Sequence, residues 1–472
     1  MTFQVELAEL NLPPFTTPTI EPQIPAETYL SRLQSLITHA SDAGYDTFVI
    51  YGDREHFGNI TFITGFDPRF EEALLVINLQ NLSAKPKLMV GMEGFGFVDI
   101  SPIADAFEVV LYQPFGLLGQ DRTQSDSLAT ILTAAGVQTG GRVGVAGWKH
   151  YSAVETATPK TWLDIPSYIA DTLRALAGGH DQVENANALL MGNQDGLRAH
   201  NDVDQLAIFE YAGSHSSQAL RNVMFGLRPG MTEYEAVGLM GLKGMAQSCH
   251  LMLSSGPRAS LGMDSPSSRV IERGDRFTNA LGIWGCLNAR AGFVVEDAAE
   301  LPESIQDYVE KLVAPYYTAI VEWYEHIGIG VPGGELYDII HNRIGDPFFG
   351  VMLNPGHLTH LDEWMNSPIY KNSAETLHSG MAIQVDVIPG TGTEYFTTNI
   401  EDGIALADEA LRNQFAATYP EAWERIQARR AFMIDVLGIQ LKPEVLPFSN
   451  IPAYLTPFLL SPTKAMRKTG LA

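Results

Sequence analysis

The sequence predicts a protein of two domains, an α/β domain followed by a larger α+β domain. The chain has 472 residues, of which 45% are apolar. This is about three times the usual domain length and enough for more than one buried core. Short β-rich runs alternate with helical periodicity in the first part of the chain, whereas strand-like runs dominate after residue 250. Short repeats typical of a solenoid or propeller are not apparent.

The first predicted domain covers residues 1–160. Residues 1–25 are rich in proline and have little periodicity, so we expect an extended arm laid over this domain. Apolar residues recur at helical spacing over 27–43, and the strand-like run DTFVIYG follows. EALLVINL, KPKLMVG, FEVVLYQP and RVGVAG are further strand-like runs, with a helix at about 125–135. These elements predict a mixed sheet flanked by helices, followed by a helical linker over 161–200.

The second predicted domain covers residues 201–410. It begins with two amphipathic helices at about 202–226 and 232–248, and Thr232 starts a capping box because a glutamate follows three residues later. CHLMLSS, DRFTNALGIWG, NARAGFVV, MAIQVDVIPG and NIEDGIALAD are strand-like, and a long helix near 302–326 interrupts them. This pattern predicts an α+β domain with antiparallel strands.

The last predicted segment, 411–472, combines a helix rich in Arg and Ala with a proline-containing strap. The strap sequence PEVLPFSNIPAYLTPFLLSP is too apolar to lie in solvent. We therefore expect it to cover either its own core or a partner subunit.

The charge balance excludes several partners. Lys and Arg number 30 and Asp and Glu number 55, which gives a net charge of −25. This argues against nucleic acid or an anionic membrane as the main partner.

No apolar run approaches the roughly 18 to 20 residues of a membrane span, and the acidic N-terminus does not resemble a signal peptide, so we expect a cytoplasmic protein. Cys249 and Cys286 are too few for a disulfide framework or a cysteine-ligated zinc site.

Several motifs resemble a known family. GDREHFGNITFITGFDPRFEEALLVI resembles the N-terminal domain of creatinase and aminopeptidase P. GLRPGMTEYEA, SRVIERGDRF, NPGHLTHLDEW, HSGMAIQVDVIPG and NIEDGIALAD resemble, in the same order, the catalytic domain that these enzymes share with prolidase and methionine aminopeptidase. The resemblance covers about residues 28–410. It implies a creatinase-type α/β N-terminal domain followed by an α+β pita-bread catalytic domain.

Peptidases of this family bind two divalent metal ions through two Asp, one His and two further carboxylates. The resemblance places the His at His357 and the last two carboxylates at Asp386 and Glu401. These three residues are also the ligand types that hold a single ion. Buried acids in strand-like segments need a partner or a cation, so we expect both carboxylates to be functional.

The two remaining Asp positions fall on the hairpin GDRFTNALGIWGCLNARAG, which contains no acid after Asp275. The candidates there are Asn279 or Ala280, and Asn288. The ligand charge therefore falls from −4 to −2, which does not compensate two divalent ions in one buried pocket. We expect no dinuclear metal centre. Arg290, close to Asn288 in the hairpin, could neutralise one of the carboxylates and make the cluster a structural ion pair.

Three functions remain open. The first, which we predict, is a hydrolase of the creatinase and prolidase type that needs no metal cofactor or depends only weakly on one, and that acts on a C–N bond of a small cationic or zwitterionic substrate. The second is an Xaa-Pro aminopeptidase or dipeptidase that uses one divalent ion on His357, Asp386 and Glu401. The third is a catalytically silent pita-bread protein that binds a ligand or partner.

Creatinase uses a His as general base. In the corresponding segment of this chain, GMDSPSSR, Asp264 stands at the position of that His. A carboxylate raises the pKa of a neighbouring His, so His357 and His360, near Asp362 and Glu363, could transfer the proton instead. The catalytic candidates are His357, His360, Asp264 and Glu401. The substrate-binding candidates are Asp386, Asn279, Asn288, Trp364, Arg54 and Arg69.

Trp364 would supply a stacking surface. In the family the N-terminal domain reaches over the active site of the other subunit, so the resemblance implies a homodimer in which Arg54 or Arg69 binds a substrate carboxylate across the dimer.

Overall fold

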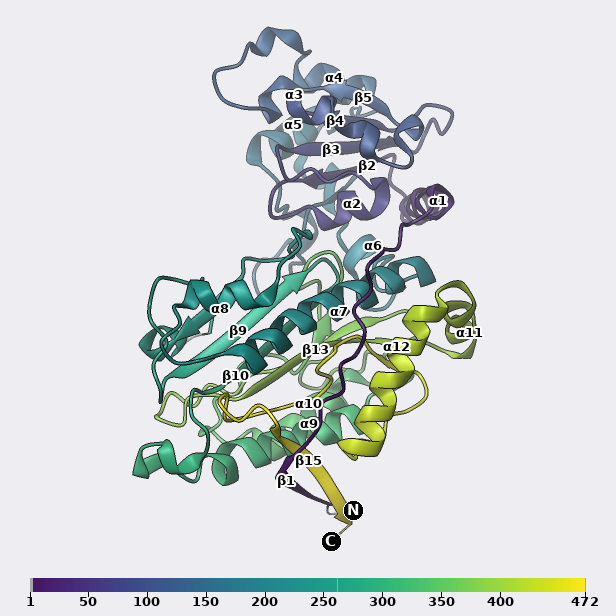
Figure 1. The fold of residues 1–472 in the computed structure, drawn as a ribbon. Helices are drawn as coiled ribbons and strands as arrows, with labels where there is room; N and C mark the ends of the chain where they lie inside the picture. Colours follow the sequence, from purple (N-terminus) through teal and green to yellow (C-terminus); the bar gives the residue numbers. More distant parts are fainter. Residues whose placement is uncertain (1–2, 261, 472) are drawn as a thin grey trace. The chain divides into compact units, whose positions relative to one another are not determined.

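The computed structural model describes residues 3–260 and 262–471 and divides into two compact units (Figure 1). Residues 24–200 form the N-terminal unit. The chain before residue 24 and the chain from residue 201 onward together form the C-terminal unit. Within the described residues, no helix is both long and apolar enough to cross a membrane.

The N-terminal unit contains the predicted mixed sheet, with strand order β5-β4-β3-β2-β6-β7. Its strands are β2 (Thr47–Gly52), β3 (Ala73–Asn78), β4 (Lys87–Val90), β5 (Glu108–Leu111), β6 (Val143–Ala146) and β7 (Val183–Asn185). Its helices are α1 (Ala26–Asp42), α2 (Gly58–Thr64), α3 (Met92–Phe95), α4 (Leu128–Ala134), α5 (Ser167–Ala177) and α6 (Ala188–Met191). Apolar side chains of α4 and α5 share one core with those of the sheet. The prediction of an α/β domain is confirmed.

Residues 161–200 were predicted to be a linker, but they belong to the N-terminal unit. Val183 of β7 pairs in parallel with Val143 of β6 and so extends the sheet. Helix α5 buries Ile169 and Leu173 in the core of this unit. Because both elements bury apolar surface, the segment completes the domain.

The N-terminal arm belongs to the C-terminal unit, so the prediction that it lies over the first domain is wrong. Strand β1 (Phe3–Glu9) pairs antiparallel with β15 (Lys464–Leu471), which brings the two ends of the chain side by side (Figure 1). Farther along, the carbonyl oxygen of Pro18 lies 2.9 Å from Nε2 of His215.

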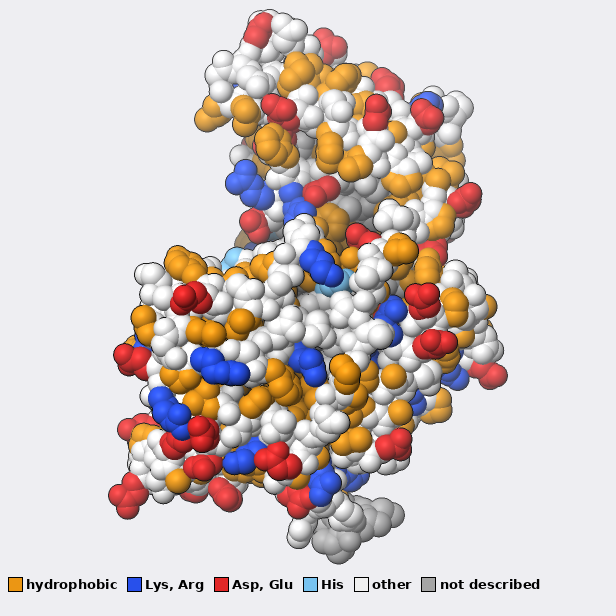
Figure 2. Space-filling model, in the orientation of Figure 1, with side chains coloured by type: hydrophobic (Ala, Val, Ile, Leu, Met, Phe, Trp, Pro, Cys, Tyr) orange, Lys and Arg blue, Asp and Glu red, His pale blue; other side chains and the backbone are white. Residues whose placement is uncertain are grey.

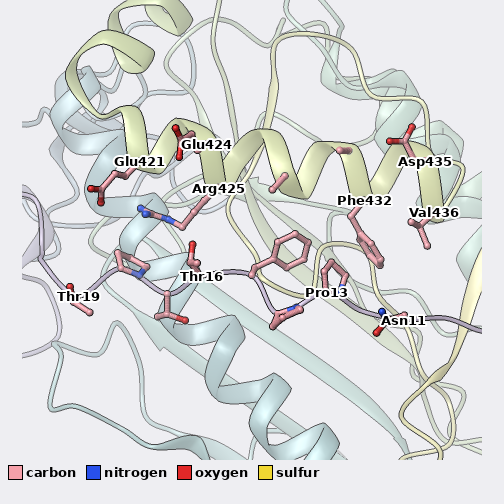
Figure 3. Close-up of a pocket in the computed structure, with 16 residues that line it drawn as sticks. Asn11, Pro13, Thr16, Thr19, Glu421, Glu424, Arg425, Phe432, Asp435 and Val436 are labelled. Atoms are coloured by element: carbon pink, nitrogen blue, oxygen red, sulfur yellow. The ribbon is translucent and has the colours of Figure 1, made fainter.

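The arm also runs beside helix α12 (Pro420–Ala431), and the two enclose a cavity of about 1050 Å³ (Figure 3). The ring of Phe15 packs edge-on against that of Phe432, with centroids 5.9 Å apart. Glu421, Glu424 and Arg425 of the helix are among the residues that line the cavity.

The C-terminal unit is built on an antiparallel sheet with strand order β11-β12-β13-β10-β9-β8, and β14 pairs with β13. The strands are β8 (Met252–Ser255), β9 (Arg276–Ile283), β10 (Cys286–Phe293), β11 (His357–Leu358), β12 (Ala382–Val387), β13 (Asn399–Leu406) and β14 (Val445–Pro447). The remaining helices are α7 (Val203–Gly226), α8 (Glu233–Met240), α9 (Ala314–His326), α10 (Gly333–Ile344) and α11 (Glu409–Thr418). The prediction of an α+β domain with antiparallel strands is confirmed.

Two helices of this unit are shorter than predicted. The capping box at Thr232 and Glu235 is present, but α8 ends at Met240 because Gly241 adopts the left-handed conformation with φ 63°. Helix α9 begins only at Ala314, after a π-helical turn over Val309–Val313. Helical periodicity did not distinguish this turn from the helix that follows it.

The C-terminal strap covers its own core, which is one of the two predicted alternatives. Leu446, Ile451 and Tyr454 are fully buried within the chain. The buried guanidinium of Arg290 lies 2.9 Å from the carboxylate of Asp402 and also donates to the carbonyl oxygens of Ile451 and Tyr454. This ion pair therefore attaches the strap to the sheet.

A second buried ion pair attaches α12 to α7. Nη1 of Arg429 lies 2.7 Å from the carboxylate of Glu210, and both side chains are fully buried. Arg429 also donates to Oδ1 of Asn450, which extends the contact to the strap.

Asp402→Asn should destabilise the protein strongly. The substitution leaves the buried guanidinium of Arg290 without a compensating charge, so the free energy of unfolding should fall by about 3–5 kcal/mol. Urea denaturation measures this loss. Glu6→Gln is the control, because it breaks the exposed ion pair between Glu6 and Arg467 and should cost about 1 kcal/mol or less. Equal losses in the two variants would contradict the role of the buried pair.

Candidate functional site

Three predicted residues converge on one face of the large sheet. Asp386 of β12 pairs directly with Glu401 of β13, and His357 of β11 pairs with Gln384 of β12. Paired residues of adjacent strands point to the same face, as do residues two apart on one strand. One ring nitrogen of His357 and one carboxylate oxygen each of Asp386 and Glu401 lie within 4.8 Å of one another, and all three residues are buried.

Glu363 completes this group, and sequence analysis did not select it. Its Oε1 lies 3.3 Å from Nε2 of His357, whereas Oδ2 of Asp386 lies 3.9 Å from the same nitrogen. We call His357, Glu363, Asp386 and Glu401 the acid cluster. The signal in the sequence was the acidic pair five and six residues after His357, but nothing there showed which of Asp362 and Glu363 faces the imidazole.

The orientation of His357 is set by its neighbours. Nδ1 lies 3.1 Å from the carbonyl oxygen of Leu358, so a proton on Nδ1 donates to that oxygen and Nε2 faces the carboxylates. The indole of Trp364 lies against the imidazole, with ring centroids 4.3 Å apart and planes inclined by 36°. Trp364 therefore lies beside His357, and its role as a stacking surface for a substrate stays a prediction.

Burial and mutual repulsion dominate the electrostatics of the cluster. Burial raises the pKa of Asp386 to about 6, while His357 opposes this shift and Glu363 adds to it. Burial also raises the pKa of Glu401 well above its usual range, and the charges of Asp386 and Glu363 add to the effect. Burial alone would lower the pKa of His357, but Glu363 and Asp386 outweigh it and the pKa is raised. The cluster therefore favours a bound positive charge.

Arg290 does not neutralise this cluster, so that alternative is wrong. Its guanidinium pairs with Asp402, the residue after Glu401. Because successive side chains of a strand point to opposite faces, Asp402 and Arg290 lie on the face away from Glu401. Among the residues that the structure describes, neither Asp386 nor Glu401 forms an ion pair with a lysine or arginine.

Asn279 and Asn288 also lie on the opposite face, so the structure does not bring them to the acid cluster, and their contact with a substrate stays a prediction. The side-chain amide of Asn288 donates to Oγ of Ser216 on α7, at 2.6 Å. In the register of the sheet, Glu401 pairs with Ala289 and Ala289 pairs with Ala280. The two positions beside Glu401 that face the cluster are therefore alanines.

His360 and Asp264 have different surroundings. His360 is buried and follows His357 by three residues in the sequence. Its ring packs edge-on against that of Phe209, with centroids 5.0 Å apart. The Asp264 side chain is 54% exposed and lies 3.5 Å from the guanidinium of Arg258, so its carboxylate is not one of the converging groups. The catalytic roles of both residues stay predictions.

Arg54 and Arg69 belong to the N-terminal unit. Arg54 is exposed. Nε of Arg69 lies 3.0 Å from Oδ1 of Asp67, and its guanidinium stacks on the ring of Phe57. Their proposed contact with a substrate stays a prediction.

The donor set fits one divalent metal ion better than two. One imidazole nitrogen and two carboxylate oxygens are donors that a divalent ion accepts, and donors of one ion lie about 3 to 4 Å apart. Ala280 and Ala289 offer no donor for a second ion. The Cys249 thiol stays neutral, because burial raises its pKa to about 12 and the charges of Glu363 and Glu401 add to this shift.

No protein-family model and no curated protein sequence matches this chain. Solved structures do match it. The prolidase from Pyrococcus horikoshii is 16% identical, with 80% of this chain and 95% of that chain covered at a TM-score of 0.59. The Xaa-Pro dipeptidase from Bacillus anthracis is 17% identical, with 81% and 96% covered at a TM-score of 0.59.

The X-Pro aminopeptidase from Thermotoga maritima is 16% identical, with 80% of this chain and 95% of that chain covered at a TM-score of 0.59. At such low identity the likeness concerns the fold. The resemblance to the creatinase, prolidase and aminopeptidase P family is therefore confirmed at the level of the fold, and this chain has the pita-bread fold.

Proposed function

We propose that the protein hydrolyses a C–N bond of a small cationic or zwitterionic substrate whose positive group binds to the acid cluster. The observation that carries this proposal is the buried pair of Asp386 and Glu401, which lie directly opposite each other on adjacent strands. Two buried carboxylates side by side repel each other unless a cation or a proton compensates them. Because Arg290 pairs with Asp402 instead, the compensating charge is free to come from the substrate.

The residues of the cluster suit the remaining steps. Hydrolysis needs a base that accepts a proton from the attacking water and an acid that protonates the leaving nitrogen. Nε2 of His357 faces Glu363, so a proton can be held between these two side chains. Glu363 is 25% exposed and is the member of the cluster most open to water. Its role would be to pass the proton between His357 and the substrate.

A second candidate is the same hydrolysis with one divalent metal ion, acting on Xaa-Pro dipeptides. It is favoured by the convergence of donor atoms of His357, Asp386 and Glu401 within 4.8 Å. When bound, such an ion polarises a carbonyl oxygen and lowers the pKa of a water molecule. Glu363 would then hold the proton that the substrate takes up.

A substrate screen separates these candidates. Guanidino, ureido and N-methyl amino acids are tested beside Xaa-Pro dipeptides, with and without a chelator. Turnover of a cationic compound that survives chelation supports the first candidate. Turnover of Xaa-Pro dipeptides that is lost on chelation and restored by one equivalent of metal supports the second. No turnover of any compound contradicts both and favours a catalytically silent binding protein.

Elemental analysis after mild purification should find at most one equivalent of Mn, Fe, Co or Zn. The reason is that Ala280 and Ala289 replace acidic donors in the row beside Glu401, and a second uncompensated ion in a buried pocket is very costly. Two tightly held ions that resist brief chelation would contradict this charge argument.

Glu401→Gln should lower substrate affinity or turnover at least tenfold, or about 1.4 kcal/mol. With almost no change in volume, the substitution removes the negative charge that Glu401 would present to a bound cation. The melting temperature should hold or rise, because repulsion between Asp386 and Glu401 is relieved. Asp402→Asn is the matched control on the same strand, and it should lower the melting temperature instead. Unchanged activity in Glu401→Gln would contradict the role of the cluster.

We also propose a homodimer. The strap no longer supports it, because the strap is buried in its own chain. The N-terminal unit, however, exposes large apolar side chains, and hydrophobic side chains are frequent on its face in view (Figure 2). Phe70 is 68% exposed and Ile100 58% exposed. Apolar surface of this kind often marks a protein contact.

Light scattering at micromolar concentration should give twice the mass of one chain. Phe70→Asp combined with Ile100→Asp should shift the protein to monomers, because both substitutions place a charge in the proposed contact. Val154→Asp is the control at another exposed apolar position of the same unit and should leave the dimer intact. A wild-type monomer that retains activity would refute the homodimer.

A further inference from the structure

A second group of side chains faces the same side of the sheet as the acid cluster. Glu401 pairs with Ala289, Ala289 pairs with Ala280, and Ala280 pairs with Met252. Since directly paired residues point to one face, a single row runs from Asp386 through Glu401 and both alanines to Met252. The row crosses five adjacent strands, from β12 to β8.

The row changes from acidic to apolar between Glu401 and Ala289. Met252, Ala280, Leu287 and Ala289 form one buried cluster, and Cys249 packs against it. We call these five residues the apolar patch. Ala289 of the patch pairs directly with Glu401, so the patch adjoins the acid cluster.

The opposite face of the same two strands packs on α7 and carries both polar and apolar side chains. Asn288 is bonded to Ser216 of α7, and Leu281, which pairs with Asn288, lies on the same face. On the face of the acid cluster, the side chains that follow Glu401 along the row are apolar, since Ala289, Ala280 and Met252 come next.

We propose that the apolar patch binds an apolar group of the substrate. The substrate would then be an amphiphilic cation, with its charged group at Asp386 and Glu401 and an alkyl or similar group over Ala289 and Ala280. Adjacent strands are about 4.8 Å apart, so Ala280 lies about 10 Å from Glu401 along the row and Met252 about 14 Å. This span fits an extended alkyl chain of up to about eleven carbons. The proposal rests on the proposed function, because the acid cluster places the charged group.

Binding of n-alkylammonium ions tests the patch without requiring turnover. Methyl- to dodecylammonium are titrated into the full-length protein, after chelation of metal ions, by isothermal titration calorimetry. Each methylene that lies on the patch should raise the affinity about fourfold. The increase should level off at the chain length that meets Met252.

Two variants should change, in opposite directions, the alkyl chain length at which the affinity levels off. Met252→Ala removes the far end of the patch, so the affinity should keep rising with longer chains. Ala280→Leu fills the middle of the row, so the affinity should level off with shorter chains. Met263→Ala, at an exposed position, is the control and should leave the profile unchanged. A general loss of stability would not shift the profile in opposite directions, and if Ala280→Leu fails to fold, Met252→Ala decides alone.

Equal affinity for all chain lengths would overturn the apolar subsite and leave the proposed function standing, since turnover and Glu401→Gln test that function separately. A profile that a folded Met252→Ala variant leaves unchanged would also overturn it. Failure of every alkylammonium ion to bind would overturn both the subsite and the cation-binding role of the acid cluster.

Discussion

The register of β13 is the constraint on which the rest of this structure depends. Its two consecutive acids point to opposite faces of the sheet, so Glu401 joins the acid cluster while Asp402 binds the buried Arg290 behind it. A shift of one residue would exchange the two and place an uncompensated charge on each face. The same strand therefore sets both the chemistry of the site and the attachment of the strap.

This division explains how the protein keeps like charges together without losing stability. Asp402 and Glu210 are fully buried, but each has an arginine partner and several further hydrogen bonds. Asp386 and Glu401 have no such partner among the described residues. Evenly distributed arginines would have neutralised all four carboxylates. Instead, the buried positive charge is concentrated on the side of the sheet that faces the strap and α7, and the site retains its affinity for a cation.

Much of the fold was predictable, because local patterns determine it. Helix α1 and the hairpin of β9 and β10 follow from periodicity, whereas the selection of His357, Asp386 and Glu401 came from the resemblance of their motifs to the creatinase and prolidase family. The sequence did not show whether alanine or asparagine faces the site beside Glu401. The choice between Asn288 and Ala289 depends on the register of the strands, which only their pairing defines. The same limit applies to Glu363, since Asp362 beside it offers the same chemistry in the sequence.

The location of the arm was unpredictable for a different reason. Pairing of β1 with β15 joins residues more than 450 positions apart, and a local sequence pattern does not indicate so distant a partner. This pairing has a consequence for biosynthesis. At about 5–20 residues per second, β1 waits roughly 20 to 90 s on the ribosome before its partner strand is made. During this interval the intervening N-terminal unit can fold by itself, whereas β1 keeps an unpaired strand edge that other chains or chaperones can reach.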